Sequence, residues 1–169
     1  DAADPGDEVI VEKGVYQENI VIDKNVNVIG IDWPTIDGGA KDGDVNTIMI
    51  PYLGDMAGKI EGFIITGGGK GGLGHGINIW DSSPTIVNNK ITLNHHNGMG
   101  IHGRAALTGK AEVYNNDISE NTIGIGNGRG SEAHIYRNRI YNNRVVGVGC
   151  RGQAAPRIDE NLIYGNWLG

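Results

Sequence analysis

The sequence predicts an all-β protein folded as a right-handed parallel β-helix solenoid of about seven coils. Three observations predict this fold: a repeat of short period, strand-like segments with no helix-like run between them, and a high glycine content. The 169 residues include 29 glycines, more than twice the average share of about 7%. The glycines follow no G-X-Y period, which excludes a collagen triple helix.

The repeat is the strongest of these signals. Each of four segments, such as "PTIVNNKITLN", carries two asparagines five residues apart with an isoleucine between them, and successive copies are 27, 22 and 23 residues apart. The first asparagines of the copies are Asn89, Asn116, Asn138 and Asn161, and the second are Asn94, Asn121, Asn143 and Asn166. A period near these values that contains only strands and turns is typical of stacked β-coils.

The repeated asparagines have a structural explanation. At a bend between two strands the main chain leaves N–H and C=O groups unpaired, and a side-chain amide offers both donors and an acceptor. Coils stack about 4.8 Å apart, so amides at equivalent positions can also bond to one another. We therefore predict two asparagine ladders that stabilise the turns and have no catalytic role. In the less regular N-terminal third, Ile65 is expected to occupy the place that Ile91 takes one coil later.

Composition and charge exclude several classes of protein. The formal net charge of −6 argues against a general nucleic-acid surface. No apolar run approaches the ~18 residues of a membrane-spanning helix. Cys150 is the single cysteine, so no internal disulfide can form. We expect residues 1–169 to form a single β-helix domain that is a fragment or trimmed part of a longer chain. Its uncapped ends would then meet further β-helix coils or another chain.

Several segments resemble a known superfamily. "PGDEVIVEKGVYQENIVIDKNVNVIG", "IEGFIITGG" and "SSPTIVNNKI" look like the right-handed β-helix repeat proteins of the pectin-lyase-like superfamily, and most like its NosD-like, carbohydrate-associated repeat domains. The resemblance implies a carbohydrate-associated protein that is extracellular, periplasmic or on the cell surface. The superfamily also contains polyuronate lyases, hydrolases, epimerases and plain scaffolds, so a polysaccharide-active enzyme is the alternative function.

The glycine-rich stretch "TGGGKGGLGHG", residues 66–76, matches the G-x-G-x-x-G pattern of dinucleotide sites. That pattern needs a helix after it, because the helix N-terminus holds the pyrophosphate. "INIWDSSPTI" follows instead and reads as a strand and a turn. We therefore expect a flexible, lengthened turn with no nucleotide affinity, and a turn histidine at His75. The other catalytic elements that accompany Gly-His-Gly in polygalacturonase-like enzymes are absent from the sequence.

One outward surface could bind a ligand. Strand alternation points Asn78, Gly100, Gly126 and Gly149 outward, which leaves a strip of nearly bare main chain over three coils. A rim of aromatic and basic residues edges this strip and consists of Trp80, His102, Arg104, Arg129 and Arg151. Such a strip suits an extended polysaccharide, since arginines pair with uronate carboxylates. The alternative is a flat sheet face in a rigid scaffold.

Chemistry beyond binding has little support in the sequence. His102 with Arg104 is the best available pair for acid–base work, and no catalytic residue is assigned. His95, His96 and His102 form a histidine group without the spacing of a metal site, so no metal is predicted. We expect no cofactor, and calcium on the scattered aspartates is an alternative that no spacing locates.

Overall fold

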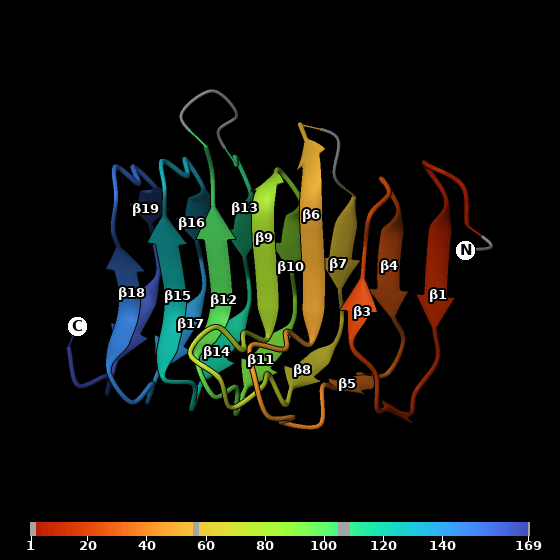
Figure 1. Ribbon diagram of the computed structural model, residues 1–169, viewed down its shortest axis with the longest axis horizontal. Coiled ribbons are helices and arrows are strands. Elements are labelled where there is room, and N and C mark those ends of the chain that lie inside the picture. The colour runs from red at the N-terminus through yellow and green to blue at the C-terminus, as the bar shows by residue number, and fades with distance from the viewer. Residues whose placement is uncertain (1–2, 56–57, 105–108, 169) are drawn as a thin grey trace.

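The computed structural model describes residues 3–55, 58–104 and 109–168. These residues form 20 β-strands and no helix. Successive strands turn through three directions, so that each coil contributes one strand to each of three sheets that run the length of the molecule (Figure 1). No part of the described chain forms a helix that is long and apolar enough to cross a membrane.

The three sheets are named here A, B and C. Sheet A consists of β1 (Glu8–Val11), β4 (Asn27–Gly30), β7 (Lys59–Glu61), β10 (Thr85–Val87), β13 (Glu112–Tyr114), β16 (His134–Tyr136) and β19 (Arg157–Asp159). Sheet B consists of β2 (Val15–Tyr16), β5 (Thr35–Asp37), β8 (Ile64–Thr66), β11 (Lys90–Thr92), β14 (Asp117–Ser119), β17 (Arg139–Tyr141) and β20 (Leu162–Tyr164). Sheet C consists of β3 (Ile20–Val21), β6 (Ile48–Gly54), β9 (Ile77–Ser82), β12 (Asn97–His102), β15 (Ile123–Gly128) and β18 (Val146–Cys150).

All pairs of neighbouring strands within the sheets are parallel, and the predicted fold class is confirmed. Sheets A and B contain seven strands each and sheet C contains six, so complete coils of three strands are fewer than the expected number of about seven. The predicted register is also observed, since Ile65 pairs with Ile91 one coil later. A parallel solenoid of this kind buries its apolar residues between the sheets, where each strand contributes every second side chain.

The core is a stack of isoleucine ladders. Ile65, Ile91, Ile118 and Ile140 follow one another along sheet B and are fully buried. On sheet C the aligned residues Ile77, Met99 and Ile125 are equally inaccessible. β-Branched side chains pack well on a pleated surface because their rotamers are already restricted. Identical residues at identical positions therefore fill the interior coil by coil.

Both predicted asparagine ladders are present. The amide of Asn116 donates to Oδ1 of Asn138 at 3.0 Å and to the carbonyl oxygens of Ile86 and Tyr114 at 2.9 and 3.0 Å. Each of the other inner rungs repeats the amide-to-amide bond to the next coil. The first ladder lies between sheets A and B, and the second lies between sheets B and C. The asparagines of both ladders therefore act structurally, as predicted.

The left-handed turn conformation falls on the residue before each ladder asparagine. Leu93, Glu120 and Asn142 precede three rungs of the second ladder with φ values of 57°, 58° and 52°. The ladder asparagines themselves have no positive φ. The left-handed conformation is therefore adopted by the preceding residue and not by the ladder asparagine.

Two loops lie against each other at one edge of sheet C. They are residues 38–47 between β5 and β6 and residues 67–76 between β8 and β9, and both project in front of the sheets in Figure 1. Main-chain N–H groups of Gly69, Lys70 and Gly71 donate to carbonyl oxygens of the other loop at 2.7, 2.9 and 2.8 Å. The glycine-rich stretch does connect two strands, as expected. Main-chain hydrogen bonds hold it against the loop 38–47, so it is not the flexible turn that was expected.

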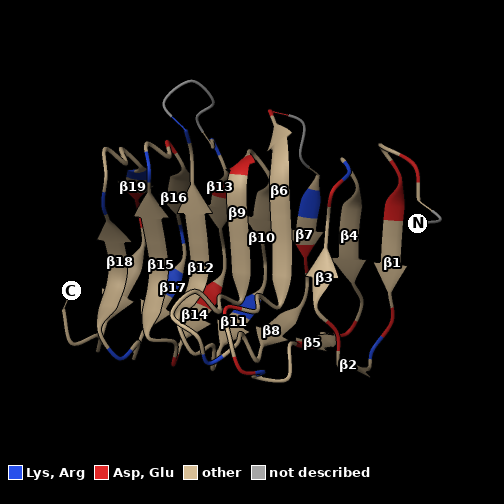
Figure 2. Cartoon of the chain, viewed as in Figure 1, with Lys and Arg blue, Asp and Glu red and all other residues tan. Residues whose placement is uncertain are grey.

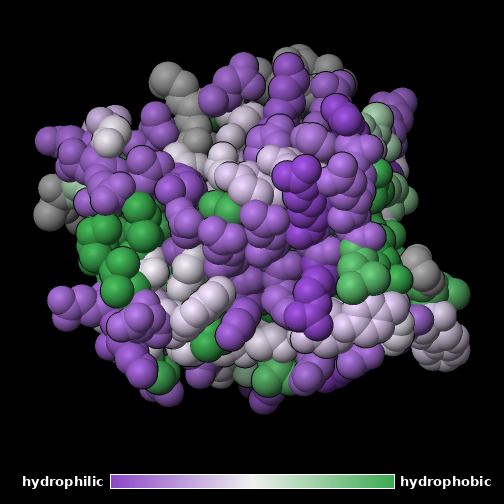
Figure 3. Space-filling view, turned by 180° about the vertical axis from the view of Figure 1, so that it is seen from behind, coloured by the Kyte–Doolittle hydropathy of each residue, from purple (hydrophilic) through white to green (hydrophobic). Residues whose placement is uncertain are grey.

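The two ends of the solenoid are more apolar than its middle. Val15 at the N-terminal end is 69% exposed, and Trp167 at the C-terminal end is 82% exposed. Seen from behind, hydrophobic residues gather toward both lateral edges of the molecule, whereas the central surface is mainly hydrophilic (Figure 3). Side chains that would be covered inside the stack are uncovered in the terminal coils.

Candidate functional site

The outer face of sheet C carries the candidate site. Register pairs Asn78 with Gly100, Gly100 with Gly126, and Gly126 with Gly149, so the four predicted strip positions do lie in a row. The long strands β6, β9, β12, β15 and β18 bear almost no charged residues along their length, and charges gather at their ends (Figure 2). The strip therefore crosses an uncharged surface that is bordered by charged turns.

The strip is not bare main chain over three coils, which corrects the expectation from alternation. A Cβ atom placed on Gly100 would lie 3.1 Å from Nε2 of His75 and 3.2 Å from Nε2 of His102, so both rings cover this glycine. The side chain of Asn97 covers Gly126 in part. Asn78 is only 6% exposed. The part that stays accessible lies over Gly126 and Gly149, both of which are half-buried.

Three histidines from two neighbouring coils meet at the closed part of the strip. Nδ1 of His75 lies 3.3 Å from Nδ1 of His96, and the ring centroids of His75 and His102 are 6.2 Å apart. The main-chain N–H of Asn97 donates to Nδ1 of His75 at 3.4 Å. This contact makes Nδ1 the acceptor, so the neutral ring of His75 carries its proton on Nε2.

Burial keeps these rings neutral. Burial first, and then repulsion from His96, His102 and Arg151, lowers the pKa of His75 to about 3. Burial is also the main cause that lowers the pKa of His102 to about 4, followed by repulsion from Arg151. His75 lies in the connection between β8 and β9, as expected for a turn histidine, but its ring is buried at the site, with only 1% exposed.

The predicted rim divides into two parts. The ring of Trp80 stacks on that of His102 with centroids 4.5 Å apart, and the guanidinium of Arg129 lies 5.3 Å from the Trp80 centroid. Arg104 points elsewhere, because its Nε pairs with the buried carboxylate of Asp81 at 3.1 Å. Its main-chain N–H also donates to Oδ1 of Asp81. The structure therefore places Trp80, His102 and Arg129 together and gives Arg104 a structural ion pair.

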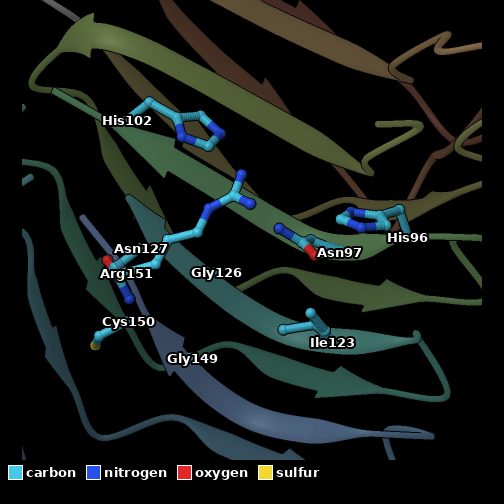
Figure 4. A pocket seen from close by; sticks show the side chains of 9 residues that line it. All are labelled: His96, Asn97, His102, Ile123, Gly126, Asn127, Gly149, Cys150 and Arg151. Atoms are coloured by element: carbon cyan, nitrogen blue, oxygen red, sulfur yellow. The ribbon is translucent and has the colours of Figure 1, made fainter. Parts of the chain in front are cut away.

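A pocket of about 190 Å³ occupies the accessible part of the strip. Its lining comes from β12, β15, β18 and the residues next to these strands. The side chains able to recognise a polar ligand include those of His96, Asn97, His102 and Arg151. Figure 4 shows the guanidinium of Arg151 reaching between His102 and Asn97. No aspartate or glutamate is among the lining residues that the structure describes. The pocket therefore offers positive charge without a competing carboxylate.

Buried polar atoms without partners concentrate around this pocket. Among the described residues they include Nε2 of His75, Oδ1 of Asn78, Oδ1 of Asn97 and Nδ1 of His102. Asn127, at the end of β15, has neither of its side-chain polar atoms paired. Each unpaired buried group costs about 1–3 kcal/mol. Such a concentration is more typical of a surface that receives a polar ligand than of a surface with a purely structural role.

Among the described residues, no group of three or more His, Cys, Asp or Glu side chains could hold a metal ion. His95 is exposed and stays apart from the contacts of His96 with His75. Sequence reasoning missed Asn97 and the position of His75. Only the sequence proximity of His96 to His102 hinted at the cluster.

Fold and site together define a parallel β-solenoid with a polar pocket on one sheet face. A family model for right-handed β-helix regions matches residues 52–169, which is more than half of the chain. The chain therefore belongs to the right-handed β-helix family. A search of curated proteins found no match, and neither did a search of solved structures.

Proposed function

We propose that this β-helix domain binds polysaccharide on the outer face of sheet C and that the pocket beside Arg151 is the centre of the binding surface. The observation that carries the proposal is the concentration of unpaired polar atoms at this one face. Sugar hydroxyls both donate and accept hydrogen bonds, so they match a surface with unpaired imidazole nitrogens and amide oxygens. The proposed setting is extracellular, periplasmic or at the cell surface, where polysaccharides are met.

Binding is favoured over a scaffold role by the placement of cations. Arg129 and Arg151 pair with no carboxylate among the described residues, although the chain as a whole is acidic. A scaffold surface gains nothing from cations held without partners beside a pocket. An acidic glycan would supply the missing carboxylates.

Binding is also favoured over polysaccharide hydrolysis. Glycoside hydrolases generally use two carboxyl groups on either side of the scissile bond. The described lining of the pocket contains none. The pair His102 and Arg104, considered from the sequence for acid–base work, is committed to other contacts, because His102 stacks on Trp80 and Arg104 pairs with Asp81.

Isothermal titration calorimetry tests the proposal. The domain is titrated with oligogalacturonate and with a neutral glucan, as the wild type and as Trp80→Ala, Arg151→Ala and Tyr136→Ala. We expect binding of the acidic oligosaccharide that weakens in both site variants and is unchanged in Tyr136→Ala, which alters sheet A. Affinity should fall as salt rises, since exposed charges are screened within about 8 Å at physiological ionic strength. Absence of heat with every glycan would leave the scaffold role.

A further inference from the structure

We propose that the pocket recognises the end of an acidic glycan chain, with a terminal uronic-acid unit seated beside Arg151. This inference rests on the proposed function and makes it more specific, because it replaces an extended ligand crossing the whole strip with a single end unit. Three features of the described residues support it: the loop that blocks one end of the strip, the small volume of the pocket, and the positive charge of Arg151.

A loop closes the strip on its N-terminal side. His75 belongs to the loop 67–76, which is tied to the loop 38–47 by main-chain hydrogen bonds. Its ring covers Gly100 together with His102, and Asn78 beyond them is only 6% exposed. A chain of sugars that lies along the strip would therefore meet two imidazole rings after Gly126 and could not continue.

The accessible part is small and open on the other side. A Cβ atom on Gly149 would have one neighbour within 4 Å, a methyl group of Val146 at 3.7 Å. The volume of about 190 Å³ is below the roughly 300–1,000 Å³ of pockets that enclose drug-sized ligands. A space of this size holds one sugar unit, and the rest of a glycan would leave over Gly149.

The charge selects the end unit. Nδ1 of His102 and Nε of Arg151 lie 3.1 and 3.5 Å from one point, the position of a Cβ on Gly128. A planar guanidinium pairs with a carboxylate through two parallel hydrogen bonds. Oδ1 of Asn97 and Nδ1 of His102 are buried and unpaired, and both belong to residues that line the pocket. They are suited to hydroxyl groups of the same sugar ring.

The experiment counts chain ends. The domain is titrated calorimetrically with galacturonate, with trigalacturonate and with long polygalacturonate of known mean length. If ends are recognised, one domain binds per chain at every length, and heats from equal masses fall as the chains become longer. If binding instead scales with the number of sugar units, the end-unit inference is overturned while the proposed function stands. If nothing binds, both are overturned.

Two glycine variants locate the site. Gly149→Val places a β-branched side chain in the pocket at a position that has room for it, and it should weaken galacturonate binding at least about tenfold. Gly72→Val is the matched control, since a Cβ there meets nothing within 4 Å and the residue is exposed on the loop. Circular dichroism verifies that both variants are folded. Equal affinity in Gly149→Val and the wild type would overturn the inference.

Discussion

The side-chain amide of Asn116 donates to Oδ1 of Asn138 at 3.0 Å, and the same oxygen accepts the main-chain N–H of Asn116 at 3.0 Å. One asparagine therefore pairs both its own main chain and its side chain with the following coil. This double contact recurs at the other inner rungs of both ladders. The inner turns of the solenoid are therefore held by buried side chains.

Asn116→Leu should lower the free energy of unfolding by about 2 kcal/mol or more, because it leaves the main-chain N–H of Asn89 without its acceptor and removes the amide donor to the carbonyl oxygens of Ile86 and Tyr114. Chemical denaturation monitored by circular dichroism measures the change. Arg144→Leu is the control, since this residue next to the ladder has an exposed side chain and no left-handed φ; it should cost less than the ladder variant. An unchanged midpoint for Asn116→Leu would contradict a stabilising ladder.

Leu93→Asn should stabilise the domain by about 0.5–1 kcal/mol. Leu93 has a φ of 57° and its side chain is 55% exposed, so it gains little from burial and lies in a conformation that costs about 1–2 kcal/mol for most residues. Asparagine tolerates this conformation and stands at the equivalent turn position 142. Thermal denaturation compares the variant with the wild type, and a lower melting temperature would count against strain at this turn.

Stability should fall in acid because of the buried histidines. The folded chain holds the pKa of His75 at about 3 and that of His102 at about 4, below the unperturbed value of about 6.5. Between these values the unfolded chain binds protons and the folded chain does not. Stability is therefore complete above about pH 6.5 and is lost as the pH falls toward 3–4, by roughly 2 kcal/mol for each histidine at pH 5.

Urea denaturation across pH 4–8, a range of about four units around the unfolded histidine value, measures this dependence. His75→Gln removes one titrating ring and should flatten the curve, whereas His95→Gln changes an exposed residue and should not. If the wild type and His75→Gln lose stability in parallel between pH 6.5 and pH 5, burial of His75 does not control the acid response.

Gly71→Ala should separate the two paired loops. A Cβ on Gly71 would lie 2.4 Å from the main-chain carbon of Gly43, and overpacking of this kind typically costs about 1–3 kcal/mol. Gly72→Ala meets nothing within 4 Å and should be neutral. Hydrogen exchange of residues 38–47 reports the loss of pairing. Equal protection in the two variants would mean that the pairing of the loops does not depend on this contact.

The fold could be predicted from the sequence because its determinants are local and repeated. An asparagine, an isoleucine and a second asparagine at fixed spacing define a turn, a buried strand and another turn, and stacking follows when copies are aligned. The alignment also gave the correct row of Gly100, Gly126 and Gly149. The resemblance to β-helix proteins and the pattern of the residues led to the same fold.

The site could be predicted only in part, since its closure depends on residues outside the repeat. His75 lies in a loop without a counterpart in the next coils, and nothing in its surroundings in sequence indicates that it covers Gly100. Asn97 was missed because alternation does not hold at the start of β12. There Gly98 faces the ladder residue Asn121 on the inner side of the sheet, as the buried Met99 does. Asn97 lies on the outer side over Gly126, whereas strict alternation would place it on the same side as Met99.

The asparagine ladders also make the coil an interchangeable module. Asn116 and Asn138 are 22 residues apart, and Asn121 and Asn143 repeat that distance. After insertion or removal of one such coil, each asparagine amide would again lie next to an asparagine Oδ1 of the following coil. Both ladders would therefore keep their hydrogen bonds without any change in the flanking turns. Evolution or design can thus lengthen the sheet faces in steps of one coil, while the loop that carries His75 keeps a fixed boundary at one position along the stack.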